Sequence, residues 1–121
     1  MVRGSPCPPE AIRQAEARLG VSLPDPLRRL LLDGDGRFDQ DGQWWTAWPL
    51  DQIVEENLNA WAKRDFPRSL LAVGDDGTGR PFCLSLSGDD DHVVRWSWID
   101  SDVETDEGSW ADFCRTWLNA P

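Results

Sequence analysis

Apolar and polar residues alternate between Leu70 and Ile99, and this pattern predicts an antiparallel β-meander. Turns rich in glycine and aspartate separate three short predicted strands, which are Leu70–Val73, Arg80–Ser87 and Val93–Ile99. In the middle strand, the apolar positions are Phe82, Leu84 and Leu86, and the positions between them are Cys83, Ser85 and Ser87. We therefore expect this strand to bury one face and to expose the other to solvent.

The third predicted strand repeats the alternation with larger side chains. Trp96 and Trp98 fall on one face, whereas Arg95 and Ser97 fall on the other. We expect the tryptophans to face the core and Arg95 to face solvent. A slip of one residue would invert this arrangement, so the strand register is expected to be firm.

Apolar residues recur at helical spacing on either side of the meander. The predicted helices run from Pro8 to Gly20, from Pro24 to Gly34, from a capping Asp51 to Ala62, and from a capping Ser109 to Leu118. The segment Gln43–Leu50 is rich in β-formers and predicts a further strand, whereas Asp100–Gly108 has five acids and no base and predicts a solvated loop. Helices and strands that do not alternate one for one indicate an α+β fold with helices packed on an antiparallel sheet.

The length of 121 residues suits one domain with a single core. We expect residues 1–7 to be a flexible leader and residues 8–121 to form the domain. The sequence contains neither a secretory signal nor an apolar run of bilayer length, so we expect a cytoplasmic protein.

No cofactor is expected from the metal-ligating residue types. The three cysteines form no C-x-x-C pair, which argues against a disulfide framework, and nothing in their spacing favours a zinc site with the one histidine. The loop Asp33–Gly42 is rich in oxygen ligands, but Trp44 stands where the EF-hand pattern needs a glutamate. Turn chemistry accounts for this loop better than calcium does.

The acidity of the chain lies in its second part. The formal net charge is −10, and −8 of it falls on residues 73–121, which hold 11 acidic and 3 basic side chains. Such a field disfavours nucleic acid and anionic membranes as partners and favours a basic protein. The alternative is that the charge serves solubility alone.

Two groups of residues are candidates for partner binding. The acidic candidates are Asp89, Asp90 and Asp91 on one turn, and Asp100, Asp102, Glu104, Asp106 and Glu107 on the predicted loop. If the turn and the loop meet at one end of the sheet, these carboxylates form a single patch; otherwise they only solvate the surface. The aromatic candidates are Trp44 and Trp45, which point to opposite faces of a strand, so that one of them is expected to be exposed as a contact.

Enzymatic roles find little support in the sequence. His92 could pair with a carboxylate as a general base, but the scattered serines and cysteines indicate no nucleophile for it. The Gly74–Gly79 turn is rich in glycine like a phosphate loop. Its aspartates would repel a phosphate, and a strand follows it in place of a helix. We expect no catalytic activity.

Several short motifs, in this order and spacing, resemble those of the SUKH superfamily. The first is E-x-x-L-G-x-x-L-P over Glu16–Pro24, followed by Asp33–Gly36, Asp75–Gly79, Val94–Trp96 with Asp100, and the helix opening Ser109–Phe113. The resemblance runs from about residue 8 to residue 118 and implies a SUKH-like single domain.

Resemblance to this superfamily, which joins fungal cell-wall-synthesis regulators with bacterial toxin-immunity proteins, implies binding in place of catalysis. We expect an immunity protein, monomeric or weakly dimeric, that neutralises a cognate basic protein toxin such as a nuclease. The acidic second part suits this role, because carboxylates can occupy the phosphate positions of a nuclease. One alternative is a regulatory or general protein-interaction module without a toxin partner. Another is an acidic enzyme or metal-binding domain.

Overall fold

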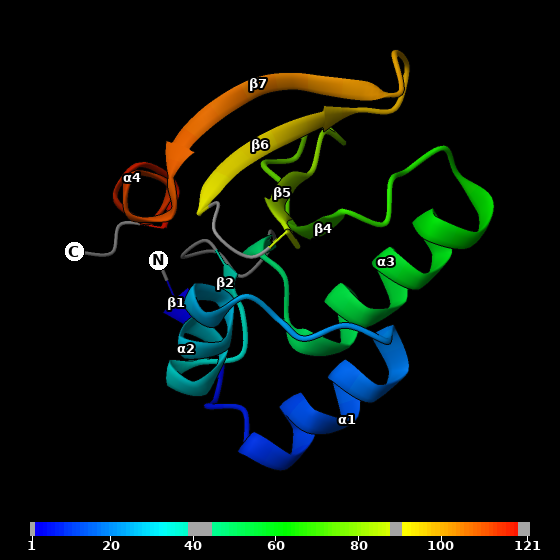
Figure 1. Cartoon of the computed structure of the whole chain (residues 1–121). Coiled ribbons are helices and arrows are strands. Elements are labelled where there is room, and N and C mark those ends of the chain that lie inside the picture. Colours follow the sequence, from blue (N-terminus) through cyan, green and yellow to red (C-terminus); the bar gives the residue numbers. More distant parts are fainter. Residues whose placement is uncertain (1, 39–44, 88–90, 119–121) are drawn as a thin grey trace.

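The computed structural model of the chain describes residues 2–38, 45–87 and 91–118. The elements in these residues are β1 (Val2–Arg3), α1 (Pro9–Leu19), α2 (Asp25–Asp33), β2 (Arg37–Phe38), β3 (Trp45–Ala47), α3 (Leu50–Lys63), β4 (Leu70–Gly74), β5 (Phe82–Ser85), β6 (His92–Ser97), β7 (Asp102–Ser109) and α4 (Trp110–Trp117). They form one α+β domain with helices on an antiparallel sheet, which confirms the predicted fold class (Figure 1).

The sheet is a meander in which each strand pairs with its neighbours in sequence. Its order is β1-β2-β3-β4-β5-β6-β7, and every pairing is antiparallel. The predicted three-strand centre is confirmed, with Cys83 of β5 paired to Ala72 of β4 and to Val94 of β6. β7 forms the long edge of the sheet.

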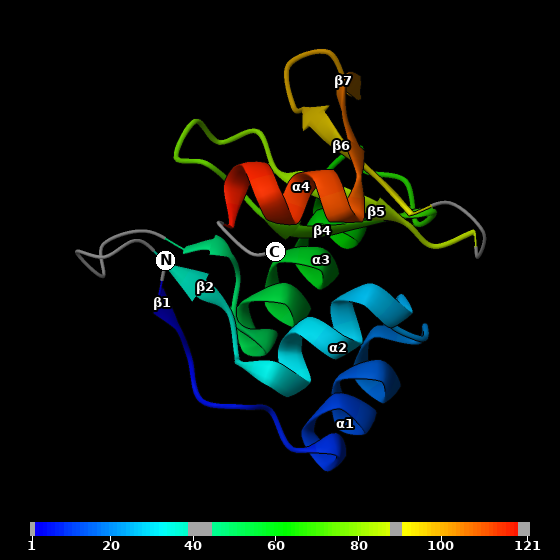
Figure 2. The ribbon, with the colours of Figure 1, turned by 90° about the vertical axis from the view of Figure 1, so that its left-hand side faces the viewer.

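Helices cover both faces of the sheet. The Phe82 ring lies 4.9 Å from the Phe113 ring and 5.0 Å from the Trp117 ring, both on α4. On the opposite face, the Trp96 ring lies 5.3 Å from the ring of Phe66, which follows α3. α1 packs on the outer side of α3, and both views show α4 and α3 on opposite sides of the central strands (Figures 1 and 2).

This double cover corrects two predictions about exposure. Cys83 and Arg95 belong to the strand faces predicted to meet solvent, but they are 0% and 6% exposed. α4 packs over the face that carries Phe82 and Arg95, where Arg95 lies 4.5 Å from the Phe82 ring and 4.9 Å from the Trp117 ring. Cys83 follows Phe82 in β5, so it lies on the opposite face, which α3 and Phe66 cover.

The predicted helices are confirmed, with one change at the start of α3. Gly20 ends α1 in the left-handed conformation at φ 76°, and Ser109 caps α4 through a reciprocal bond with Asp112. α3 begins at Leu50 after an N-cap Pro49, so the prediction that Asp51 caps it is wrong. The carboxylate of Asp35 accepts the Leu50 N–H at 2.7 Å and supplies the missing cap from a distant turn.

A buried amide joins α3 to the sheet. Asn57 is 0% exposed, and its side chain bonds both the N–H and the carbonyl of Ala72, each at 2.8 Å. Its amide nitrogen also donates to the Ile53 carbonyl at 2.7 Å. Because the amide oxygen and the amide nitrogen of Asn57 are both hydrogen-bonded, the side chain can be buried in an apolar interface.

The predicted solvated loop at Asp100–Gly108 is wrong, because most of it is the strand β7. β7 pairs with β6 from His92 opposite Ser109 to Ser97 opposite Asp102. Its acidic side chains are tolerated because β7 is an edge strand whose carboxylates remain in contact with solvent or with arginines. The last two residues of the third predicted strand, Trp98 and Ile99, lie outside β6 and belong to the turn into β7.

Two further segments differ from the predictions. Residues 2–7 are attached to the sheet in place of forming a loose leader, because Val2 and Arg3 pair with β2 and Cys7 is buried. The strand predicted at Gln43–Leu50 is shorter, and its described part is Trp45–Ala47. No helix in the described part of the chain is long and apolar enough to cross a bilayer.

Candidate functional site

The acidic candidate residues fall mainly on the β6–β7 hairpin. Asp102, Glu104, Asp106 and Glu107 lie on β7, and Asp100 lies in the turn before it. Asp91 directly precedes β6 and is exposed, and its carbonyl accepts the Trp110 N–H at 2.8 Å. Asp89, Asp90 and Trp44 lie outside the described residues.

These acids do not form the single patch that the sequence suggested. The register places Ser97 opposite Asp102 at one end of the hairpin and His92 opposite Ser109 at the other. At about 3.3 Å per residue, the two ends are about 16 Å apart, which exceeds the Debye length of about 10 Å. Asp100 and Asp102 therefore form one group, and Asp91 and Asp106 belong to the other end. The role of each in partner binding stays a prediction.

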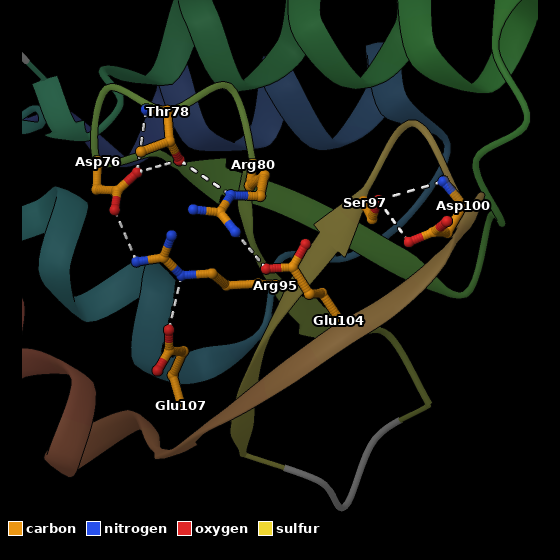
Figure 3. Close-up of polar contacts among 8 residues, drawn as sticks. All are labelled: Asp76, Thr78, Arg80, Arg95, Ser97, Asp100, Glu104 and Glu107. Carbon is orange, nitrogen blue, oxygen red and sulfur yellow. Dashed lines mark hydrogen bonds and ion pairs between the residues drawn. The ribbon is translucent and has the colours of Figure 1, made fainter.

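A buried arginine organises the end of the hairpin near α4 (Figure 3). Arg95 Nε donates to Glu107 Oε1 of β7 at 2.6 Å, and Arg95 Nη2 lies 2.9 Å from Asp76 Oδ2 of the β4–β5 turn. The arginine side chain is 7% exposed, whereas those of Asp76 and Glu107 are 17% and 22% exposed. One cation thus holds the turn, β6 and β7 together.

The paired charges outweigh the effect of burial in this cluster. Burial alone would raise the pKa of Asp76, but hydrogen bonds from Thr78 and Arg95 bring the pKa below its ordinary value. Burial would likewise lower the pKa of Arg95, but the bonds to Asp76 and Glu107 raise it. Asp76 and Arg95 are therefore both charged at neutral pH.

The glycine-rich turn after β4 is held against β7 by a second arginine. Asp76 Oδ1 accepts the Thr78 hydroxyl at 2.6 Å and the Thr78 N–H at 3.1 Å. Arg80 Nε donates to the Thr78 hydroxyl at 3.3 Å, and Arg80 Nη1 forms an ion pair with Glu104 (Figure 3). These contacts make the turn a structural clamp on the hairpin.

His92 does meet a carboxylate, as the sequence suggested. Its Nδ1 lies 2.9 Å from Asp106 Oδ2, and the two side chains are 49% and 57% exposed. The Gly108 N–H and His92 both lower the pKa of Asp106. A thiol nucleophile finds no support here, since burial raises the pKa of Cys83 and Cys114 and raises that of Cys7 to about 12.

Asp100 and Asp102 differ from the acids of the arginine clusters. Asp100 Oδ2 accepts the Ser97 hydroxyl at 3.3 Å, and Asp102 Oδ1 accepts the Val103 N–H at 2.7 Å. Both residues are exposed, and neither forms an ion pair with a base in the described part of the chain. Their negative charges are therefore presented to solvent at the tip of the hairpin.

The hairpin tip also carries apolar residues that the sequence analysis did not single out. Ile99 is 96% exposed and Val103 is 44% exposed. The sequence did contain a signal for the exposure of Ile99, because Ile99 follows Trp98 directly and so breaks the alternation of β6. The sequence analysis instead treated Ile99 as the last residue of the strand.

Trp45, the described member of the tryptophan pair, is half-buried. Its ring lies 4.5 Å from that of Phe38, and a Cβ on Gly36 would meet the Trp45 ring at 2.5 Å. Trp45 therefore packs closely within the fold, and a contact role for this pair stays a prediction.

The E-x-x-L-G-x-x-L-P motif builds a groove on the helical side. The Glu16 carboxylate accepts the Leu23 N–H at 2.7 Å and pairs with Arg28 at 2.9 Å, which fixes the α1–α2 connection. A groove of about 380 Å³ lies between this connection and the end of β5. Its lining residues include Pro24, Arg28, Leu84 and Asp91.

No group of three or more histidine, cysteine or carboxylate side chains in the described residues is arranged to hold a metal ion. No curated protein matches the chain.

A family comparison agrees with the fold and with the motifs that build it. The sequence profile of the SMI1 / KNR4 family (SUKH-1) matches residues 6–117, which span β5, the clamping turn, the hairpin and all four helices of the described structure. This match covers nearly the whole chain, and the chain therefore belongs to the SMI1 / KNR4 family (SUKH-1).

Proposed function

We propose that this chain is an immunity protein that binds a cognate basic protein toxin in the cytoplasm and neutralises it by covering its active site. The observation that carries the proposal is the β6–β7 hairpin, whose tip presents Asp100 and Asp102 without ion pairs to described bases, beside exposed apolar side chains. Membership of the SMI1 / KNR4 family (SUKH-1) is consistent with this role.

The charge of the chain supports a basic partner. A formal net charge of −10 on 121 residues creates a field that accelerates encounter with a basic protein and slows encounter with nucleic acid. A nuclease toxin is basic where it holds phosphate, so carboxylates on the inhibitor can take the place of the phosphates. The inhibitor itself needs no cofactor and no catalytic group for this role.

The proposal is tested with the toxin domain of a secreted protein encoded beside this chain. The purified domain is titrated with the purified chain in a calorimeter at about 50 mM and about 200 mM salt. We expect a one-to-one complex whose dissociation constant rises with salt, because charged groups steer and stabilise the contact. Absence of a complex at both salt concentrations would contradict the proposal.

Charge variants separate a local contact from a general field effect. Asp100→Asn with Asp102→Asn removes two charges at the hairpin tip, and Glu10→Gln with Asp51→Asn removes two exposed charges on α1 and at the start of α3 (Figure 1). We expect the first pair to weaken binding more than the second at equal net charge. If both double variants weaken binding equally, the tip acts only through the net charge of the chain and makes no specific contact.

A regulatory or general protein-interaction module of the same fold is the alternative. Such a module is expected to bind several proteins loosely, so a tight complex with one basic protein favours the immunity protein.

A further inference from the structure

The β6–β7 hairpin extends beyond the helical layers of the domain. In both views its turn lies at one extremity of the molecule, on the side away from α1 and α2 (Figures 1 and 2). Ile99 is in this turn and is 96% exposed, while Val103 on the adjacent strand is 44% exposed. Burial of an isoleucine side chain is favourable, and Ile99 gains almost none of this stabilisation within the fold, so it can gain it in a contact outside the chain.

The turn that carries Ile99 is held in one conformation by local bonds. The Ser97 hydroxyl bonds the Asp100 carboxylate at 3.3 Å and accepts the Asp100 N–H at 3.2 Å. Ser101 takes the left-handed conformation at φ 52°, and the Arg64 guanidinium lies 3.7 Å from the centre of the Trp98 ring. A side chain presented on an ordered turn loses little conformational entropy when it binds.

The charges around Ile99 select the kind of partner. Asp100 and Asp102 are exposed near Ile99, so a matching surface has lysines or arginines around an apolar depression. A second copy of this chain on the same tip would bring four carboxylates together, which disfavours a symmetric dimer. An anionic membrane would repel the same carboxylates.

We propose that the tip of the β6–β7 hairpin anchors this chain on its basic protein partner. Ile99 enters an apolar depression of the partner, and Asp100 and Asp102 pair with basic side chains at its rim. This inference rests on the proposed function, because the partner is the toxin domain of the binding test above.

The test compares two serine variants that remove an exposed aliphatic side chain. Ile99→Ser changes the hairpin tip, and Leu32→Ser changes a side chain on α2 that is 38% exposed. Calorimetric titration of the same toxin domain is expected to show about 10- to 100-fold weaker binding for Ile99→Ser, which corresponds to the burial of one isoleucine. We expect Leu32→Ser to bind within about twofold of the wild type.

The outcomes separate this inference from the proposed function. If the wild type, Ile99→Ser and Leu32→Ser all bind the toxin domain equally well, the proposed anchor is refuted, but the proposal that the chain is an immunity protein is not. If the wild type does not bind the toxin domain, both are overturned. Two further measurements on the wild type would also overturn the anchor: dimerisation in sedimentation that Ile99→Ser abolishes, or flotation with phosphatidylserine vesicles that Ile99→Ser abolishes.

Discussion

Replacement of Arg95 by methionine removes the cation that joins the β4–β5 turn, β6 and β7. The change preserves the apolar stem that packs on Phe82 and Trp117, but it leaves Asp76 and Glu107 without the base that both of them contact. Loss of one partner from a buried ion pair costs about 3–5 kcal/mol. Because these carboxylates retain 17% and 22% exposure, we expect a loss of about 3 kcal/mol in the free energy of unfolding.

The loss is measurable by urea unfolding followed through tryptophan fluorescence. With an unfolding slope of about 2 kcal/mol per molar urea, the midpoint is expected to fall by about 1.5 M. A domain of this size has a total stability of about 5–15 kcal/mol, so the variant remains folded in the absence of urea.

A second arginine, which lies in the β4–β5 turn and contacts the same hairpin, provides the matched control. Arg80 forms an ion pair with Glu104, but its side chain is 44% exposed. Since exposed pairs contribute less than about 1 kcal/mol, Arg80→Met is expected to lower the midpoint by no more than about 0.5 M. If the two variants lose equal stability, the cluster around Arg95 does not act as a buried ion pair.

The pH dependence of stability shows whether Arg95→Met destabilises the fold through the lost ion pairs or through lost packing. The folded-state pKa of Asp76 lies below its ordinary value of 3.8, so this group stabilises the wild type above that pH and ceases to do so as the pH falls through the folded-state value. In Arg95→Met the charged Asp76 carboxylate has no base beside it and destabilises the folded state, and protonation of Asp76 removes this cost. The stability difference between the two proteins must therefore shrink below about pH 4. A difference that is constant with pH would refute the electrostatic explanation.

Three further predictions follow from single contacts. Asn57→Leu leaves the N–H and the carbonyl of Ala72 without their side-chain partner and is expected to cost about 2–4 kcal/mol in urea unfolding; a cost below about 1 kcal/mol would contradict this. In Gly74→Ala the new Cβ would lie 1.8 Å from the Thr46 carbonyl oxygen, so β3 and β4 must separate, and the melting temperature is expected to fall; an unchanged value would refute the close approach. All three cysteines are buried, so Ellman's reagent is expected to react slowly with the folded protein and with three thiols after unfolding, whereas rapid native reaction would contradict the burial.

The elements that depend on local signals were predictable from the sequence. Gly20 ends α1, Ser109 caps α4, and the alternation in residues 70–97 defines β4 to β6. Each of these signals acts within a few residues, so it can be recognised without knowledge of the tertiary structure.

The elements that depend on distant partners were not predictable. β7 has no apolar alternation, and it is a strand because β6 supplies its hydrogen bonds and because Arg80 and Arg95 neutralise two of its carboxylates. The burial of Cys83 likewise depends on cover on both faces of the sheet, which the pattern of a single strand does not reveal.

The candidate surface was predictable in its charge but not in its shape. The acidic residues that the sequence analysis named lie mainly on one hairpin, yet the register separates Asp91 from Asp100 and Asp102 by the length of β6. The exposure of Ile99 depends on the position of the turn, which the sequence pattern placed within the strand.

Protection of growing cells tests the proposed function most directly. The candidate toxin domain of the binding test is expressed in a bacterial host alone, with the wild-type chain, and with the Ile99→Ser and Leu32→Ser variants at equal protein levels. We predict that the wild type and Leu32→Ser restore growth and that Ile99→Ser restores it less. Cells that die equally with and without the wild-type chain would contradict the proposal that this protein is an immunity protein for that toxin.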